Sequence, residues 1–206
     1  MNSSSQNGVV IQRFLDESQR ANAAHLFDEA FATKFKNAIP DDELRKEFWS
    51  KILVSSQVFS AFDKDVLVGI AVMSSAEKSG FNKRASKILF EVLGPIKWMR
   101  AVFYFLIFSR LDSKIKPGTL YLEAISVASN ARGRGIGRIM LAELNNFCLD
   151  KNFDNLQLKV IFENESALKL YLREGFKVIK NQELKFLKYI LGFSGVATMN
   201  LEIKFN

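Results

Sequence analysis

The chain has 206 residues, which suits a single globular domain, and its 48% hydrophobic and 25% charged residues are ordinary values for such a fold. The net charge of +7 favours an anionic partner, but the absence of a long Lys/Arg block with interleaved aromatic residues disfavours nucleic acid. One cysteine and a polar start without a signal peptide argue against a disulfide-built secreted protein and predict a cytoplasmic location.

The N-terminal part of the chain predicts a strand followed by two helices. Residues 1–8 are polar and are expected to form a disordered tail, and the apolar run at 9–14 predicts the first strand. Apolar residues recur at helical spacing after Ser18, and Pro40 limits that helix. A pair of aspartates then caps a second helix that extends to about Leu53.

The next part predicts a β-hairpin and then a helical insertion before the fourth strand. Two apolar runs flank an Asp-Lys-Asp turn at 63–65, and the glycine at 69 indicates a bulge. The insertion covers about 78–113 and is broken at Gly94-Pro95.

The second helix of this insertion, at 96–111, contains the continuously apolar run AVFYFLIF at 101–108. A bilayer span needs ~20 apolar residues, so the run is too short to cross a membrane. Three interpretations stay open: a helix buried in the core, the face of a homodimer, or a helix at a membrane surface. We expect its exposed aromatic side to mediate self-association.

The centre of the sequence, from Tyr121 to Ala142, predicts a strand, a glycine-rich turn and a helix. Alternation places Glu123, Ile125 and Val127 on one face of the strand and Leu122, Ala124 and Ser126 on the other. Two apolar strands follow later, at 155–162 and 196–205, with a helix at about 167–174 and a short strand at 176–179 between them.

The turn itself has the features of an anion site. It consists of Arg132, Gly133, Arg134, Gly135, Ile136, Gly137 and Arg138. Its glycines let the backbone approach a ligand closely, and the first N–H groups of the following helix carry partial positive charge. With the added arginine charge, the turn predicts a phosphate-bearing ligand, of which a pyrophosphate fits best. The alternative is an ordinary strand-to-helix turn with solvated arginines.

Two motifs resemble those of the GNAT superfamily of N-acetyltransferases. The coenzyme A loop of that family, Arg/Gln-x-x-Gly-x-Gly/Ala, is matched by Arg132, Gly135 and Gly137. A second motif, Asn-x-x-Ala-x-x-x-Tyr-x-x-x-Gly-Phe, is matched by Asn164, Ala167, Tyr171, Gly175 and Phe176. The resemblance covers about residues 120–178 and implies an α/β GNAT fold for 9–206: a central mixed, mostly antiparallel twisted sheet flanked by helices.

The resemblance also implies acetyl-CoA as the cofactor. Its pantetheine arm would bind along the central strand, at Ile125, Ser126 and Val127, and its pyrophosphate at the main-chain N–H groups of the turn. Asn164 would contact the pantetheine arm, although it also suits an N-cap. Ala167 and Tyr171 of the same motif would also belong to the cofactor site.

Two residues are candidates for catalysis of acetyl transfer to an amine. Tyr171 is the candidate general acid for the departing thiolate, and its alternative role is packing between helix and sheet. Glu123 is the candidate general base, and its alternative role is a structural ion pair. No covalent intermediate is required, which agrees with the lack of a credible nucleophile: Cys148 is expected to be buried and inert, and His25 has no second metal ligand nearby in the sequence.

The acceptor is expected to be a primary amine of a small molecule or peptide. In the resembled family the first two helices wall the acceptor site, so one or two of Phe31, Phe35 and Phe48 would contact it rather than only fill the core. The alternative function is a non-catalytic acyl-CoA-binding module or sensor of the same fold, associated with a membrane through 96–111.

Overall fold

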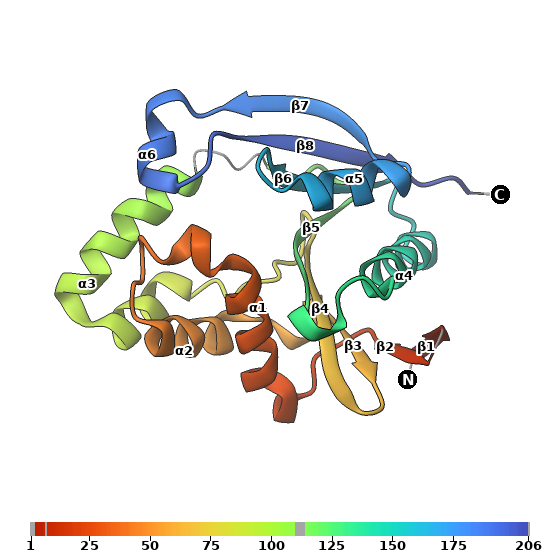
Figure 1. Cartoon of the computed structure of the whole chain (residues 1–206), viewed down its shortest axis with the longest axis horizontal. Helices are drawn as coiled ribbons and strands as arrows, with labels where there is room; N and C mark the ends of the chain where they lie inside the picture. The colour runs from red at the N-terminus through yellow and green to blue at the C-terminus, as the bar shows by residue number, and fades with distance from the viewer. Residues whose placement is uncertain (1–2, 7, 110–113, 206) are drawn as a thin grey trace.

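The computed structural model describes residues 3–6, 8–109 and 114–205, and in these residues eight strands form one sheet (Figure 1). The strand order is β1-β2-β3-β4-β5-β6-β8-β7, and every neighbouring pair is antiparallel except β5 and β6. The strands are β1 Ser3–Gln6, β2 Val9–Gln12, β3 Val58–Asp63, β4 Val66–Ser74, β5 Thr119–Val127, β6 Asn155–Ile161, β7 Lys177–Glu183 and β8 Gly195–Glu202. The predicted mixed, mostly antiparallel sheet is confirmed.

Helices cover both faces of this sheet and divide the hydrophobic core in two. The helices are α1 Arg20–Phe35, α2 Asp42–Ile52, α3 Ala85–Ser109, α4 Ile136–Asp150, α5 Glu165–Arg173 and α6 Lys188–Leu191. One core lies between the sheet and α1, α2 and α3, and the other between the sheet and α4 and α5. Because both faces are covered, β4 is buried along its whole length after Val66.

A β-bulge at Glu123 changes the direction of the side chains along β5. Val72 pairs with Ala124 but its neighbour Met73 pairs with Leu122, so Glu123 is the additional residue. Before the bulge, Leu122 packs in the α4–α5 core; after it, Ala124 packs in the α1–α3 core. The predicted strict alternation is therefore wrong beyond Leu122, because one extra residue exchanges the two faces of a strand.

The same position is where β5 separates from β6. Their parallel pairing ends at Leu122 and Leu158, while β6 continues beside β8 as far as Ile161. Beyond Leu122, β5 stays paired with β4. The two strands thus diverge in the middle of the sheet and leave an opening between them.

The N-terminal segment differs from the predicted disordered tail. Ser3–Gln6 pairs antiparallel with β2, and Gly8, with φ 78°, lies in the turn before β2. A strand can join a sheet edge through backbone hydrogen bonds alone, so the polar composition of this segment did not reveal it.

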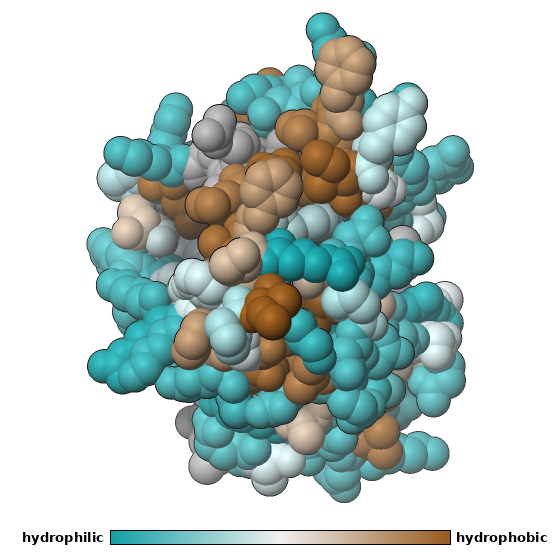
Figure 2. Space-filling model, turned by 90° about the vertical axis from the view of Figure 1, so that its left-hand side faces the viewer, coloured by the Kyte–Doolittle hydropathy of each residue, from teal (hydrophilic) through white to brown (hydrophobic). Residues whose placement is uncertain are grey.

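The predicted helical insertion forms α3, which lies between β4 and β5 and so precedes the fourth strand counted from Val9. Gly94, with φ 69° and ψ 174°, breaks the helix where Gly94-Pro95 predicted it. Residues 110–113 of the predicted insertion lie outside the described residues. One side of α3 is buried through Leu93, Ala101 and Tyr104, and its other side exposes apolar side chains (Figure 2). Among the residues described, no helix is both long and apolar enough to span a membrane.

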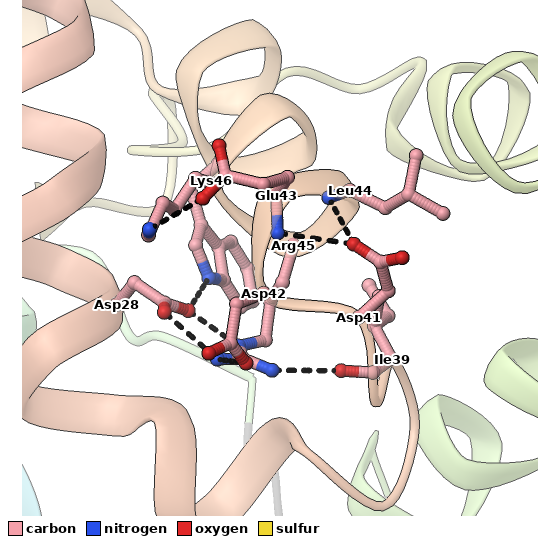
Figure 3. A network of polar contacts seen from close by, with 9 residues as sticks. Asp28, Ile39, Asp41, Asp42, Glu43, Leu44, Arg45 and Lys46 are labelled. Carbon is pink, nitrogen blue, oxygen red and sulfur yellow. Dashed lines mark hydrogen bonds and ion pairs between the residues drawn. The ribbon is translucent and has the colours of Figure 1, made fainter.

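A buried ion pair joins α1 to α2 (Figure 3). Arg45 is 2% exposed and binds Asp28 on α1, the carbonyl oxygen of Ile39 and the carboxylate of Asp42. The indole of Trp49 also donates to Asp28, at 3.1 Å. This network fixes the helix pair as one unit against the sheet.

Candidate active site

A cleft of about 950 Å³ opens where β5 separates from β6. Its walls come from α1, from β5 and β6, from the glycine-rich turn with the start of α4, and from α5. The elements that the two sequence motifs predicted to form a site therefore meet in one cavity.

The glycine-rich turn forms one end of the cleft. Gly135 is the N-cap of α4 and has a left-handed backbone with φ 79°, which favours glycine, and Ile139 donates its N–H to the Gly135 carbonyl at 3.0 Å. A Cβ at Gly137 would lie 3.4 Å from Leu170, an ordinary van der Waals contact, so the start of α4 lies next to α5. The first N–H groups of a fifteen-residue helix thus face the cleft and fit a phosphate group.

The three arginines of this turn each lie beside a carboxylate. Arg132 pairs with Glu29 of α1 at 3.4 Å, and Arg138 pairs with Glu174 at 3.3 Å. Arg134 pairs with Asp63 of the β3–β4 hairpin at 2.7 Å and does not line the cleft. Glu29 and Glu174 line the cleft with their partners Arg132 and Arg138 and offset their charge, so the helix N-terminus is the main source of positive potential at this end.

The second motif forms the adjacent wall. The side chain of Asn164 caps α5, because its Oδ1 accepts from the N–H of Ala167 at 3.2 Å, and both residues line the cleft. On β5, Ser126 donates from Oγ to the carbonyl oxygen of Leu26 at 2.8 Å, which holds the strand against α1. Asn164 thus combines the capping role with a position beside the cleft.

Tyr171 is the buried residue of α5 in this wall. It is 6% exposed, its ring centroid is 5.6 Å from that of Phe176, and it lines the cleft. Burial raises the pKa of its hydroxyl, so the side chain is neutral near pH 7. Full proton transfer to a thiolate of pKa ~8.5 would be uphill from such a phenol. Tyr171 is therefore suited to donate a hydrogen bond to a departing sulfur while it also packs in the core.

Glu123 lines the cleft at the bulge in β5 and is half-buried. The bulge places this carboxylate where β5 and β6 begin to diverge, whereas the regular alternation predicted it on the face of Ile125 and Val127. Ile125 and Val127 pack towards the α4–α5 core and line the cleft from there.

The structure adds a lysine that sequence analysis missed. Lys34, on α1, lines the cleft, and its Nζ lies 4.9 Å from the ring centroid of Phe31. Burial lowers the pKa of Lys34 to about 8. Phe31 also lines the cleft, whereas Phe35 and Phe48 are buried in the core between α1 and α2. A lysine five residues after Glu29 carries no motif, so only the packing of α1 reveals it.

Most of the residues predicted for the site line this cleft. They are Glu123, Ile125, Ser126, Val127, Arg132, Gly133, Gly135, Ile136, Gly137, Arg138, Asn164, Ala167 and Tyr171. Cys148 is fully buried in α4, and burial raises the pKa of its thiol to about 12, as expected for an inert cysteine. His25 is exposed on α1, and the described residues contain no cluster of acidic, histidine or cysteine side chains that could hold a metal.

Known proteins share both the fold and parts of the sequence. The N-acetyltransferase from Staphylococcus aureus Mu50 superposes with a TM-score of 0.64 at 20% identity, over 93% of this chain and 99% of that one. A GCN5-related N-acetyltransferase from Kribbella flavida gives 0.62 at 18% identity, over 96% and 99%. At these identities the likeness shows the fold alone.

Two curated relatives are similar in sequence over part of the chain. N-alpha-acetyltransferase 50 from Danio rerio is 29% identical over 106 residues, which is 50% of this chain and 63% of that protein. The probable N-acetyltransferase san from Drosophila melanogaster is 32% identical over 75 residues, 36% of this chain and 41% of that protein. The chain thus covers less than two thirds of either relative. The family model of the acetyltransferase (GNAT) family matches residues 23–176, more than half of the sequence, and the chain belongs to that family.

Proposed function

We propose that the protein is an acetyl-CoA-dependent N-acetyltransferase that transfers an acetyl group to a primary amine. Acetyltransferases of this family use acetyl-CoA in general, and the acetyl thioester supplies the activated acyl group. The observation that carries the proposal is that a helix N-terminus, a bulged and diverging strand, Tyr171 and Glu123 all line one cleft.

The residues of the cleft suit the binding of a long phosphate-bearing thioester. The N–H groups at the start of α4 would hold its phosphates, and the part of β5 that has left β6 would align its flexible arm. Asn164, fixed as the cap of α5, would lie beside that arm.

The chemistry is direct attack of the amine nitrogen on the thioester carbonyl. A C–N bond forms and the C–S bond breaks; the attacking nitrogen loses one proton, and the sulfur leaves as a thiolate that takes up a proton from water. Glu123 would accept the proton of the amine, directly or through water, and Tyr171 would donate a hydrogen bond to the sulfur as negative charge develops on it.

The acceptor is a small-molecule or peptidyl amine reached between α1, β5 and β6. One of the relatives is named N-alpha-acetyltransferase 50, which makes the α-amino group of a peptide a first acceptor to test. We also propose a cytoplasmic location, where acetyl-CoA and such acceptors meet.

A thiol-release assay over a panel of peptide α-amines, lysine side chains and small primary amines tests this function. We expect thiol release only when an acceptor is added, with a matching mass increase of one acetyl group in the product. Binding of coenzyme A without transfer to any acceptor would instead support the alternative function, a non-catalytic acyl-CoA-binding module of the same fold.

A further inference from the structure

An exposed apolar face covers the side of the molecule formed by α3 and α6, apart from the cleft (Figure 2). We define this α3–α6 face by six exposed side chains: Ile96, Met99, Phe103, Phe186, Tyr189 and Ile190. The first three follow helical spacing along α3, and the others lie on α6 and on the short helical turn η4 (Lys185–Leu187) that precedes it. Ile96 and Phe186 are 84% and 85% exposed, values that core residues do not show.

The two elements of this face are held together by hydrogen bonds through Asn37, in the turn after α1. Arg100 of α3 donates to the carbonyl oxygen of Asn37 at 2.8 Å, and the amide of Asn37 donates to the carbonyl oxygen of Ile190 at 3.1 Å. The hydroxyl of Tyr104 also contacts the carbonyl oxygen of Leu191, at 3.4 Å. These bonds hold α3 and α6 side by side.

The charged residues inside the two stretches that carry the face, 95–107 and 184–191, are all basic, and the nearest carboxylates in the sequence, Glu91 and Glu183, lie outside them. Lys97 and Arg100 are exposed on α3, and Lys185 and Lys188 are exposed beside α6. Neither 95–107 nor 184–191 contains an aspartate or a glutamate. Aromatic and aliphatic side chains with interspersed lysine and arginine are typical of surfaces that lie on anionic membranes.

The charge pattern also distinguishes between the occupants that could cover this face. In a two-fold symmetric dimer the same patch meets itself, which brings the cations of the two copies into one interface with no carboxylate from 95–107 or 184–191 to offset them. An anionic bilayer instead offers negative charge to the cations and an apolar layer to the side chains. We propose that the α3–α6 face docks on a membrane surface containing anionic phospholipid.

Sedimentation of the full chain with phospholipid vesicles tests the proposal. We expect binding to vesicles of phosphatidylcholine with phosphatidylserine, weaker binding to phosphatidylcholine alone, and a decline as salt is raised. Phe186→Ser should lower the partition coefficient about tenfold or more, since it removes an exposed aromatic side chain that the bilayer would bury. Lys97→Gln should lower it about fivefold. Both side chains are exposed, so these variants should fold normally, which thermal unfolding checks.

Two matched controls separate this face from general attraction by a basic protein. Val66→Ser removes an apolar side chain that is 62% exposed at the β3–β4 turn, and Lys151→Gln removes an exposed cation after α4. Both should bind vesicles as well as the parent chain. Equal losses in the controls and in the face variants would overturn the proposal, because binding would then not depend on the α3–α6 face. A dimer that Phe186→Ser dissociates, with no preference for anionic vesicles, would overturn it in favour of a second copy.

Discussion

The guanidinium of Arg45 binds the carboxylate of Asp28 at two points, with Nε–Oδ1 at 2.5 Å and Nη2–Oδ2 at 2.8 Å, inside the layer between α1 and α2 (Figure 3). The pair raises the pKa of Arg45, chiefly through the hydrogen bonds to Asp28. It fixes α1, the helix that contributes Glu29, Phe31 and Lys34 to the wall of the cleft.

Removing one partner of this pair should destabilise the protein strongly. Asp28→Asn leaves the buried Arg45 without its full counter-charge, and we expect a loss of about 3 kcal/mol in the free energy of unfolding, measured with urea. Glu47→Gln, which breaks the exposed pair with Lys51, should cost no more than ~0.5 kcal/mol. Similar losses in both variants would contradict a structural role for the buried pair.

Coenzyme A binding should depend on the backbone at Gly135. Coenzyme A should raise the thermal midpoint of the parent chain by mass action. Gly135→Asp should abolish this shift, because it forces a side chain into a left-handed backbone and adds negative charge at the helix N-terminus. Gly8→Asp is the control, since Gly8 has a similar φ of 78° but lies in the β1–β2 turn. An unchanged shift in Gly135→Asp would refute the assignment of the loop.

The hydroxyl of Tyr171 should act on the chemical step. Tyr171→Phe keeps the ring in the core and deletes only the donor, so stability and coenzyme A affinity should hold while kcat falls by roughly 10²–10³. The defect should shrink with a thioester whose thiol is more acidic, because that leaving group needs less stabilisation. Tyr189→Phe, at an exposed position, should have no effect. Full activity of Tyr171→Phe would leave Tyr171 with packing alone.

The carboxylate of Glu123 should matter most when the acceptor is protonated. Glu123→Gln should lower kcat/KM by about 10² at neutral pH, and the defect should ease as pH rises towards the acceptor pKa, ~8 for a peptide α-amine and ~10 for an alkyl amine. The Tyr171→Phe defect should not ease in this way. Glu77→Gln, in an exposed loop, is the control. A defect of Glu123→Gln that is constant with pH would indicate a structural role.

The buried amine of Lys34 should make stability depend on pH. Its pKa is about 8 in the folded chain, below the ordinary value of 10.5, so the unfolded chain holds this proton more tightly. The free-energy cost of folding with a charged Lys34 is complete below pH 8 and disappears as pH rises from 8 to 10.5. At pH 7 the free energy of unfolding of Lys34→Met should therefore exceed that of the parent by roughly 1–2 kcal/mol, because the partial exposure of Lys34 limits the gain. Near pH 10.5 the difference should be smaller.

Lys36→Met provides the comparison for this effect, because Lys36 is exposed two residues further along the chain. It should change stability little at any pH in this range. Parallel pH profiles for Lys34→Met and the parent would show that Lys34 is solvated in solution.

Features that depend on neighbouring residues could be predicted from the sequence alone. The Gly94 break, the Asn164 cap and the glycine turn at Gly135 follow from backbone preferences that act within a few residues. The two motifs around them identified the family, which the family model then confirmed.

Features that depend on distant parts of the chain were decided by the tertiary structure. The bulge at Glu123 arises from the register between β4 and β5, which exchanges the faces that simple alternation had predicted. Arg134 turns to Asp63, 71 positions away in the sequence, and Lys34 becomes partly buried only because α1 packs beside the cleft. Side-chain direction, charge pairing and desolvation are set by what the fold brings together, and local composition does not encode that proximity.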